Sequence, residues 1–257
     1  MITIAIANQK GGVGKTTIAY NLAQILSNRP KTKVLAIDND PQGNLTSSFL
    51  EDSTEVKANI LDAYDEKPLE PVKISKSLYL LGSNISLAPV AEREFQIIFR
   101  LKEGIERLNS INQSSRFDYI VIDTLPSFGH LHLAALTAAD YVLIPVKPAP
   151  YALKGMVDFL KLVEKVKRRL NQDLKILGIV INQVDGRKPN LERGMEAALR
   201  ETYGNLVFKS KINKRVNVEA SPAFQQPITE YNPKGLSARE FKAMAIEMIR
   251  RIKREGR

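Results

Sequence analysis

Lysines, glycines and threonines are concentrated in the segment from Lys10 to Thr17, which reads Lys-Gly-Gly-Val-Gly-Lys-Thr-Thr. Glycine has no Cβ atom, so the backbone N–H groups of such a segment can approach the oxygens of a phosphate closely. Lys15 can place a positive charge on the terminal phosphates, and the Thr16 hydroxyl can reach a Mg²⁺ ion that accompanies them. The residue types and their spacing predict a phosphate-binding loop.

Carboxylates follow two apolar runs of the chain. Asp38 and Asp40 come after the run 33–37, and Asp123 comes after the run 117–122. Side chains repeat every two residues along a strand, so Asp38 and Asp40 point to the same side if the strand persists. Open α/β sheets bind ligands at the carboxyl ends of their strands, which favours a role in ligand chemistry. The alternative is that these residues only cap a following helix.

The elements that must position these residues alternate between strand and helix. The apolar run 2–7 leads into the loop, and the apolar spacing after it predicts a helix. Further strands are predicted near Val34, Leu78, Phe117, Tyr141, Ile176 and Leu206, with helices over 89–109, 154–170, 190–203 and 237–254. This order predicts an α/β fold, a doubly wound and mostly parallel sheet with helices on both faces, in one domain spanning 1–257.

Two of these helices carry apolar stripes that are expected to face the core. In the helix over 154–170 the stripe is Val157, Leu160, Val163, Val166 and Leu170. In the terminal helix it is Phe241, Met244, Ala245, Met248, Ile249 and Ile252.

Composition narrows the chemistry. The 257 residues include no cysteine, which excludes disulfides, thiolate metal sites and cysteine nucleophiles. His130 and His132 are two residues apart, a poor spacing for a shared metal on one helix, so they are expected to be packing or surface residues. The formal charge of +10 favours a polyanionic partner, nucleic acid or anionic lipid, although such a charge can also serve solubility alone. No apolar run approaches the length of a spanning helix, so the protein is expected to be cytoplasmic.

The pattern Lys-Gly-Gly-x-Gly-Lys-Thr-Thr resembles the deviant Walker A box of the ParA/MinD/Soj ATPases, a branch of the P-loop NTPases. The ordinary loop has glycine where Gln9 stands here. The segment from Asp38 to Asn44, Asp-x-Asp-Pro-Gln-Gly-Asn, resembles ParA proteins more closely than MinD proteins. The resemblance covers nearly the whole chain and implies that ATP and Mg²⁺ are the cofactors.

The resemblance also implies roles for individual residues. Lys10 would reach across a homodimer to the partner's nucleotide, Lys15 would hold the phosphates and Asp40 would orient the attacking water. Thr16, Asp38 and Asp123 would hold Mg²⁺ and its waters. Asn182 would recognise adenine. The expected nucleotide-binding residues are Lys10, Gly11, Gly12, Val13, Gly14, Lys15, Thr16, Thr17, Asn182, Ile212 and Asn213.

The remaining implications concern DNA and partner proteins. Basic residues expected to face DNA are Arg187, Lys188, Lys211, Lys214 and Arg215. The implied function is partition of a plasmid or chromosome. An ATP-dependent dimer would bind DNA non-specifically on the nucleoid, and a ParB-like centromere-binding protein would stimulate hydrolysis. No membrane partner is expected. No N-terminal helix-turn-helix domain is expected either, because the phosphate loop begins so early in the chain.

Two other functions remain open on the same scaffold. One is a MinD-like positioning ATPase that binds membranes through its terminal helix. The other is an enzyme that phosphorylates or ligates a small molecule, as dethiobiotin synthetases do.

Overall fold

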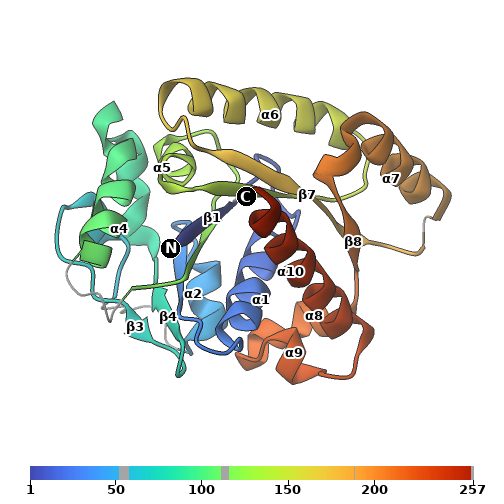
Figure 1. Ribbon diagram of the computed structural model, residues 1–257, viewed down its shortest axis with the longest axis horizontal. Helices are drawn as coiled ribbons and strands as arrows, with labels where there is room; N and C mark the ends of the chain where they lie inside the picture. The colour runs from blue at the N-terminus through green and yellow to red at the C-terminus, as the bar shows by residue number, and fades with distance from the viewer. Residues whose placement is uncertain (52–57, 111–115, 188, 256–257) are drawn as a thin grey trace.

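The computed structural model describes residues 1–51, 58–110, 116–187 and 189–255, without the side chain of Pro189. Within these ranges one sheet of eight strands forms the centre of the molecule, in the order β3-β4-β2-β5-β1-β6-β7-β8 (Figure 1). β3 pairs antiparallel with β4, and the other pairs are parallel. The strands are β1 (Ile2–Ile6), β2 (Val34–Asn39), β3 (Val72–Lys73), β4 (Leu78–Leu81), β5 (Tyr119–Thr124), β6 (Tyr141–Val146), β7 (Lys175–Val184) and β8 (Val207–Asn213).

Helices cover both faces of the sheet (Figure 1). The α-helices are α1 (Lys15–Ser27), α2 (Asn44–Phe49), α3 (Leu61–Tyr64), α4 (Arg100–Ser110), α5 (His130–Ala138), α6 (Ala152–Arg169), α7 (Pro189–Tyr203), α8 (Val216–Ala220), α9 (Ile228–Tyr231) and α10 (Leu236–Glu255). Short 3₁₀ helices are η1 (Ile85–Glu92), η2 (Phe95–Phe99), η4 (Gly204–Leu206) and η5 (Ser221–Phe224). The predicted doubly wound α/β architecture is confirmed.

The core lies in layers on the two sides of the sheet. On one side Ile4 and Ile6 of β1 belong to a buried cluster with α1 and α10. On the other side two clusters join the sheet to α4 and α5, and to α6 and α7. Strands buried on both faces need continuous apolar runs rather than alternation, which is why β2 and β6 are buried at every position.

The predicted helix over 89–109 is wrong over its first half. The 3₁₀ helices η1 (Ile85–Glu92) and η2 (Phe95–Phe99) take up this half, and only Arg100–Ser110 is α-helical. Pro89 lies within η1 and donates no backbone hydrogen bond, and the backbone is extended at Arg93, where ψ is 167°. An apolar spacing of three residues fits a 3₁₀ turn as well as an α-helix, so the spacing alone did not separate them.

Two further boundaries differ from the predictions. β5 begins at Tyr119 and continues to Thr124, so Asp123 lies inside the strand rather than after it. β8 extends to Asn213, and the short strand β3 was not predicted.

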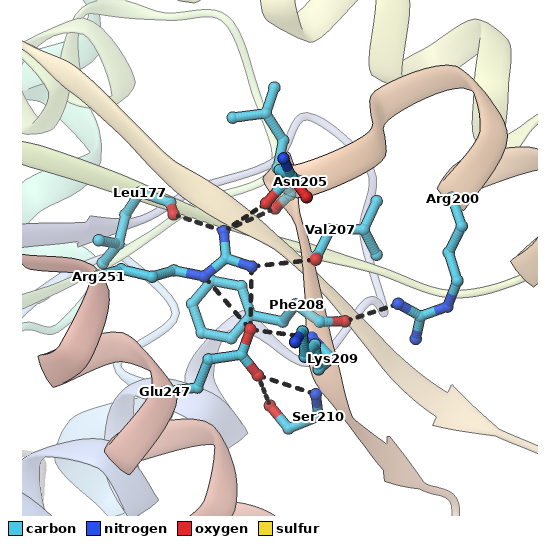
Figure 2. A network of polar contacts seen from close by, with 10 residues as sticks. Leu177, Arg200, Asn205, Val207, Phe208, Lys209, Ser210, Glu247 and Arg251 are labelled. Atoms are coloured by element: carbon cyan, nitrogen blue, oxygen red, sulfur yellow. Dashed lines mark hydrogen bonds and ion pairs between the residues drawn. The ribbon is translucent and has the colours of Figure 1, made fainter. Parts of the chain in front are cut away.

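The C-terminal helix is fastened to β7 and β8 through Arg251 (Figure 2). Its Nη1 atom donates to the carbonyl oxygens of Asn205, at 2.9 Å, and Leu177, at 3.3 Å. Its Nη2 atom donates to Glu247 Oε1, at 2.9 Å, and to the Val207 carbonyl, at 3.0 Å. The predicted apolar stripe of α10 is buried along its whole length. The helix is thus held by apolar burial and by a guanidinium clamp.

The two ends of the described chain lie at the amino-terminal edge of the sheet. β1 begins at Ile2, one residue from the N-terminus. At the end of α10 the charge of Glu255 raises the pKa of Tyr141, the first residue of β6, after the larger effect of burial. No helix in the described ranges is long and apolar enough to cross a membrane.

Candidate functional site

The phosphate loop connects β1 to α1 and is held in place by two buried asparagines. Asn8 Nδ2 donates to the carbonyl oxygen of Pro145 at 2.7 Å, and Asn8 Oδ1 accepts from the Lys10 N–H at 3.0 Å. Asn182 Nδ2 donates to the carbonyl oxygen of Val13, also at 2.7 Å. These bonds join the loop to β6 and β7, so its backbone N–H groups are positioned before any ligand binds.

Glycine is required at two positions of this loop by backbone conformation. Gly12 and Gly14 have φ angles of 69° and 85°, in the left-handed region that side chains disfavour. At Gly14 a Cβ atom would also collide with the amide of Asn182. Gly14 stands immediately before α1, whose free N–H groups and dipole favour an anion there.

The two lysines of the loop have opposite environments. Lys15 is 6% exposed and its Nζ donates to the Lys10 carbonyl oxygen at 3.4 Å. Burial lowers the Lys15 pKa, and the carboxylates of Asp123 and Asp40 oppose that shift. The Lys10 side chain is exposed instead. Lys15 is therefore directed to the acidic centre of its own subunit, whereas Lys10 is not.

Asp38 and Asp123 are direct neighbours on the adjacent strands β2 and β5. Both are fully buried. Asp38 Oδ2 accepts from Thr46 N at 2.8 Å and from Thr46 Oγ1 at 2.7 Å, and its Oδ1 accepts from Asp40 N at 3.2 Å. Burial raises the Asp38 pKa to about 6. The carboxylate therefore fixes the first turn of α2, so the capping alternative weighed for this residue describes part of its role.

Asp123 is the carboxylate that fits a cation. Burial raises its pKa well above the usual value, and the charge of Asp38 adds to the shift, while the Thr16 hydroxyl opposes it. Its Oδ2 atom is buried and has no hydrogen-bond partner in the described part of the chain. An anionic oxygen buried in this way is costly unless a cation or a donor approaches it. A divalent cation between Asp123 and a phosphate would satisfy it.

The described residues contain no group of three or more His, Cys, Asp or Glu side chains that could hold a metal by themselves. Mg²⁺ does not need such a cage when phosphates are present, because it binds through one or two protein groups together with phosphates and waters. Thr16 and Asp123 suit that kind of site.

Asp40 faces a cleft of about 500 Å³ that the phosphate loop borders. Its Oδ1 accepts from Gln42 N at 3.0 Å, which holds the carboxylate in place. Several other residues of this cleft were not predicted as site residues from the sequence. They are Gln42, Asn44, Ser48, Thr124, Pro126, Gln183 and Pro222, of which Gln42 and Asn44 lie within the Asp-Pro-Gln-Gly-Asn segment.

A small pocket of about 50 Å³ lies beside the loop, next to Thr17. The three residues predicted to contact the base, Asn182, Ile212 and Asn213, all border it. The Asn182 amide nitrogen is already bonded to Val13, and Asn213 Nδ2 donates to Glu240 Oε1 at 2.6 Å. The structure therefore brings these three residues together. The side-chain amides of Asn182 and Asn213 also form hydrogen bonds within the protein.

The basic residues predicted to face DNA are paired with carboxylates. Lys188 lies outside the described residues. The four others form ion pairs: Arg187 with Asp185 at 2.6 Å, Lys211 with Glu196 at 2.8 Å, Lys214 with Glu219 at 3.4 Å, and Arg215 with Glu240 at 2.6 Å. Because each charge is partly neutralised within the protein, these residues give less positive potential than their number suggests.

His132 is a packing residue, as predicted. It is fully buried, its Nδ1 lies 3.2 Å from the Leu125 carbonyl oxygen, and its ring meets that of Phe159 edge to face. Burial lowers the His132 pKa to about 4, so the ring is neutral at physiological pH. His130 packs its ring edge to face against Phe95.

Comparison with known proteins agrees with this geometry. Residues 1–176 match a protein family described as an AAA domain. The chain is 35% identical over 256 residues to the sporulation initiation inhibitor protein Soj of Bacillus subtilis, covering 95% of this chain and 97% of that protein. It is 34% identical over 259 residues to the chromosome-partitioning ATPase Soj of Thermus thermophilus, covering 97% and 96%. The chain belongs to the ParA/Soj family of partition ATPases.

This partition ATPase also shares its fold with a solved enzyme of different purpose. Cobyrinic acid a,c-diamide synthase of Mycobacterium smegmatis, crystallised with ADP and magnesium, superposes with a TM-score of 0.77 at 27% identity, covering 100% of this chain and 97% of that one. The scaffold therefore supports more than one reaction, and the assignment to partition comes from the family.

Proposed function

We propose that this ParA-type partition ATPase pairs with a second copy of itself when each copy holds ATP and Mg²⁺. The observation that carries the proposal is the separation of the two loop lysines. Lys15 is buried near Asp40 and Asp123, whereas Lys10 is exposed and has no carboxylate within ion-pair distance in the described part of the chain. Each subunit uses its own Lys15 and offers Lys10 to the nucleotide of the other.

The residues of one subunit divide the work of ATP hydrolysis. Backbone N–H groups from Gly11 to Thr17 hold the phosphates, and Asp40 orients the attacking water. Thr16 and Asp123 hold Mg²⁺ and its waters. Asp38 acts on the metal's waters and on the position of Asp40, since its Oδ1 accepts from the Asp40 N–H and its Oδ2 from Thr46 of α2. The metal supplies positive charge to the phosphates, and the solved ADP–magnesium relative supports this cofactor set.

The base of the nucleotide occupies the small pocket beside Thr17. Asn182, Ile212 and Asn213 border this pocket and recognise adenine there. Residues 1–257 act as one ATPase unit, because strands from both halves of the chain contribute to the loop, the acidic centre and this pocket.

Pairing doubles a net charge that is already +10. Each DNA phosphate that a cation neutralises releases counterions, so a dimer binds DNA much more tightly than one copy does, and its affinity falls steeply with salt. Arg187, Lys188, Lys211, Lys214 and Arg215 are proposed to take part. The four that the structure describes must exchange their carboxylate partners for phosphates.

The cycle is reset by a ParB-like centromere-binding protein that stimulates hydrolysis and releases the subunits from DNA of the nucleoid. The name of one relative, the chromosome partitioning protein ParA of Myxococcus xanthus, supports the role in partition on which this step depends.

A MinD-like membrane role fits the structure less well. The apolar stripe of α10, from Phe241 to Ile252, is buried against the protein core. A helix that lies on a bilayer must present its apolar face to lipid, and α10 cannot do so while it is docked.

The decisive experiment measures dimerisation and DNA retention with ATP, with ADP and without nucleotide, across a salt series. We expect ATP-bound protein alone to form dimers and to retain DNA. Lys10→Ala should keep ATP binding within about threefold, or 0.7 kcal/mol, yet fail to dimerise. Lys15→Ala should lose ATP binding itself, and Lys76→Ala, an exposed lysine on the turn before β4, should behave as the wild type.

Equal DNA retention with and without nucleotide would contradict the proposal, as would normal dimerisation of Lys10→Ala. Flotation with anionic liposomes in the same three nucleotide states separates the membrane alternative, which requires lipid binding without DNA binding.

A further inference from the structure

An apolar groove lies on the outer side of α6, away from the nucleotide cleft. Val157 and Leu160 form its floor, Tyr203 at the end of α7 borders it, and its volume is about 500 Å³. The apolar stripe predicted for this helix included Val157 and Leu160 as core residues. The structure buries Met156 and Phe159 there instead and leaves Val157 43% exposed.

Cations line the rim of this groove. Lys161, Lys165 and Arg168 border it together with one carboxylate, Glu164. Arg168 pairs with Glu164 at 3.2 Å, whereas Lys161 and Lys165 form no ion pair with any described residue. The six groove residues of α6 follow the spacing i, i+3, i+4, i+7, i+8 and i+11 from Val157, so they form one face of the helix.

The apolar floor and the basic rim of the groove together distinguish among the molecules that could bind there. DNA offers phosphates but nothing apolar that would cover Val157 and Leu160. A second copy of this chain carries a net charge of +10 and would meet the lysines with repulsion. A segment with apolar residues on one side and carboxylates beside them complements both the floor and the rim.

We propose that the groove between α6 and the end of α7 is a docking site for an acidic amphipathic helix of a partner protein. The α6 face runs from Val157 to Arg168, about 16 Å at 1.5 Å per residue, which matches about three turns of a docked helix. Apolar side chains of the partner cover Val157 and Leu160, and its carboxylates meet Lys161 and Lys165. Such helix-in-groove docking uses the i, i+3, i+4 and i+7 positions of the bound segment.

The site is separate from the proposed ATP-dependent pairing, because no residue of the groove borders the nucleotide cleft or the phosphate loop. Docking is therefore expected in the absence of nucleotide. This also makes failure of the groove proposal distinguishable from failure of the proposed function.

The test uses the full chain without nucleotide and a fluorescein-labelled synthetic helix of about 18 residues, long enough to cover the groove. The probe has leucines at i, i+3, i+4 spacing flanked by glutamates, and a second probe has lysine at every glutamate position. Fluorescence anisotropy is expected to show saturable binding of the acidic probe and at least tenfold weaker binding of the basic probe, a difference of about 1.4 kcal/mol.

Variants locate the binding. The double change Lys161→Glu and Lys165→Glu should weaken the acidic probe at least tenfold, and Val157→Glu should weaken it by a similar factor. The matched control, Lys167→Glu with Arg169→Glu, changes the total charge equally on the same helix but outside the groove, and should change the affinity less than threefold. Thermal melting of each variant checks that the fold is kept.

Four results would overturn the proposal: no saturable binding of the acidic probe, equal binding of both probes, equal losses in the groove variant and its control, or wild-type affinity in folded Val157→Glu. Loss of ATP-dependent DNA retention in Lys161→Glu/Lys165→Glu would assign these lysines to the DNA surface instead.

Discussion

At the scale of single residues, the phosphate loop depends on the absence of a side chain at Gly14. Its φ angle of 85° is one that L-residues rarely adopt, and a Cβ atom there would displace the Asn182 amide that holds Val13. The glycine thus allows the loop and its buried support to approach each other. The sequence showed that glycine was needed here, but it did not show that Asn182 was the reason.

Gly14→Ala is expected to lower the free energy of unfolding without nucleotide by about 2–4 kcal/mol, because left-handed strain and a steric clash add together. At Gly12 an added Cβ atom meets nothing within 4 Å, so Gly12→Ala should lower the free energy of unfolding only through left-handed strain, by about 1–2 kcal/mol. Gly186→Ala, in open space and without a left-handed φ, should be nearly neutral. Urea unfolding of the three variants checks the order, and equal losses at positions 12 and 14 would contradict it.

His132 makes stability depend on pH. Its pKa is about 4 in the folded protein and about 6.5 in the unfolded chain, so the unfolded state binds more protons between these values. The stability contributed by the neutral ring is therefore complete above about pH 6.5 and is lost as the pH falls towards 4, by roughly 3 kcal/mol.

We expect the difference in unfolding free energy between the wild type and His132→Leu to change with pH. The wild type should lose stability relative to the variant as the pH falls from 7 to 4.5. Burial raises the Asp38 pKa to about 6, which acts in the opposite sense, but Asp38 is present in both proteins and cancels in the comparison. A difference that stays constant over this range would show that His132 does not titrate differently in the folded state.

At the scale of elements, α10 illustrates how a charged residue can serve packing. The sequence left open a membrane contact for this helix. The structure places the Arg251 guanidinium 4.1 Å from the centre of the Phe208 ring, where it donates to the carbonyls of Leu177, near the start of β7, and Val207, at the start of β8 (Figure 2). Glu247 in turn accepts from the N–H groups of Lys209 and Ser210.

Replacing Arg251 with methionine should lower the free energy of unfolding by about 3 kcal/mol, because Glu247 and several carbonyl groups lose their donor. Arg254→Met, an exposed position on the same turn, should change it by less than about 0.5 kcal/mol. Thermal and urea denaturation measure both. Similar effects of the two changes would show that the clamp contributes little beyond the buried apolar stripe.

The elements predicted best from the sequence were those whose apolar residues follow a simple repeat. Buried strands such as β2 and β6 are continuous apolar runs, and the stripe of α10 repeats regularly. Prediction failed where one pattern fits two structures. The spacing of Phe95 and Ile98 fits 3₁₀ and α-helix alike, and the polar positions of α6 did not reveal that Val157 faces outward.

At the scale of the whole molecule, the strand order brings chemistry from distant parts of the chain to one edge of the sheet. Asp38 and Asp123 are neighbours because β2 and β5 pair, and the phosphate loop joins them because β1 lies next to β5. Motif spacing predicted that these groups would meet. It could not predict the ion pairs of Arg215 with Glu240 or Lys211 with Glu196, because such partners depend on how helices dock across the sheet.

The position of the chain ends has a practical consequence for following this protein in cells. Met1 and the end of α10 lie at the edge of the sheet opposite the phosphate loop. A fluorescent reporter fused to either end would therefore lie on the far side of the molecule and leave uncovered both the nucleotide cleft and the face proposed to pair with a second copy.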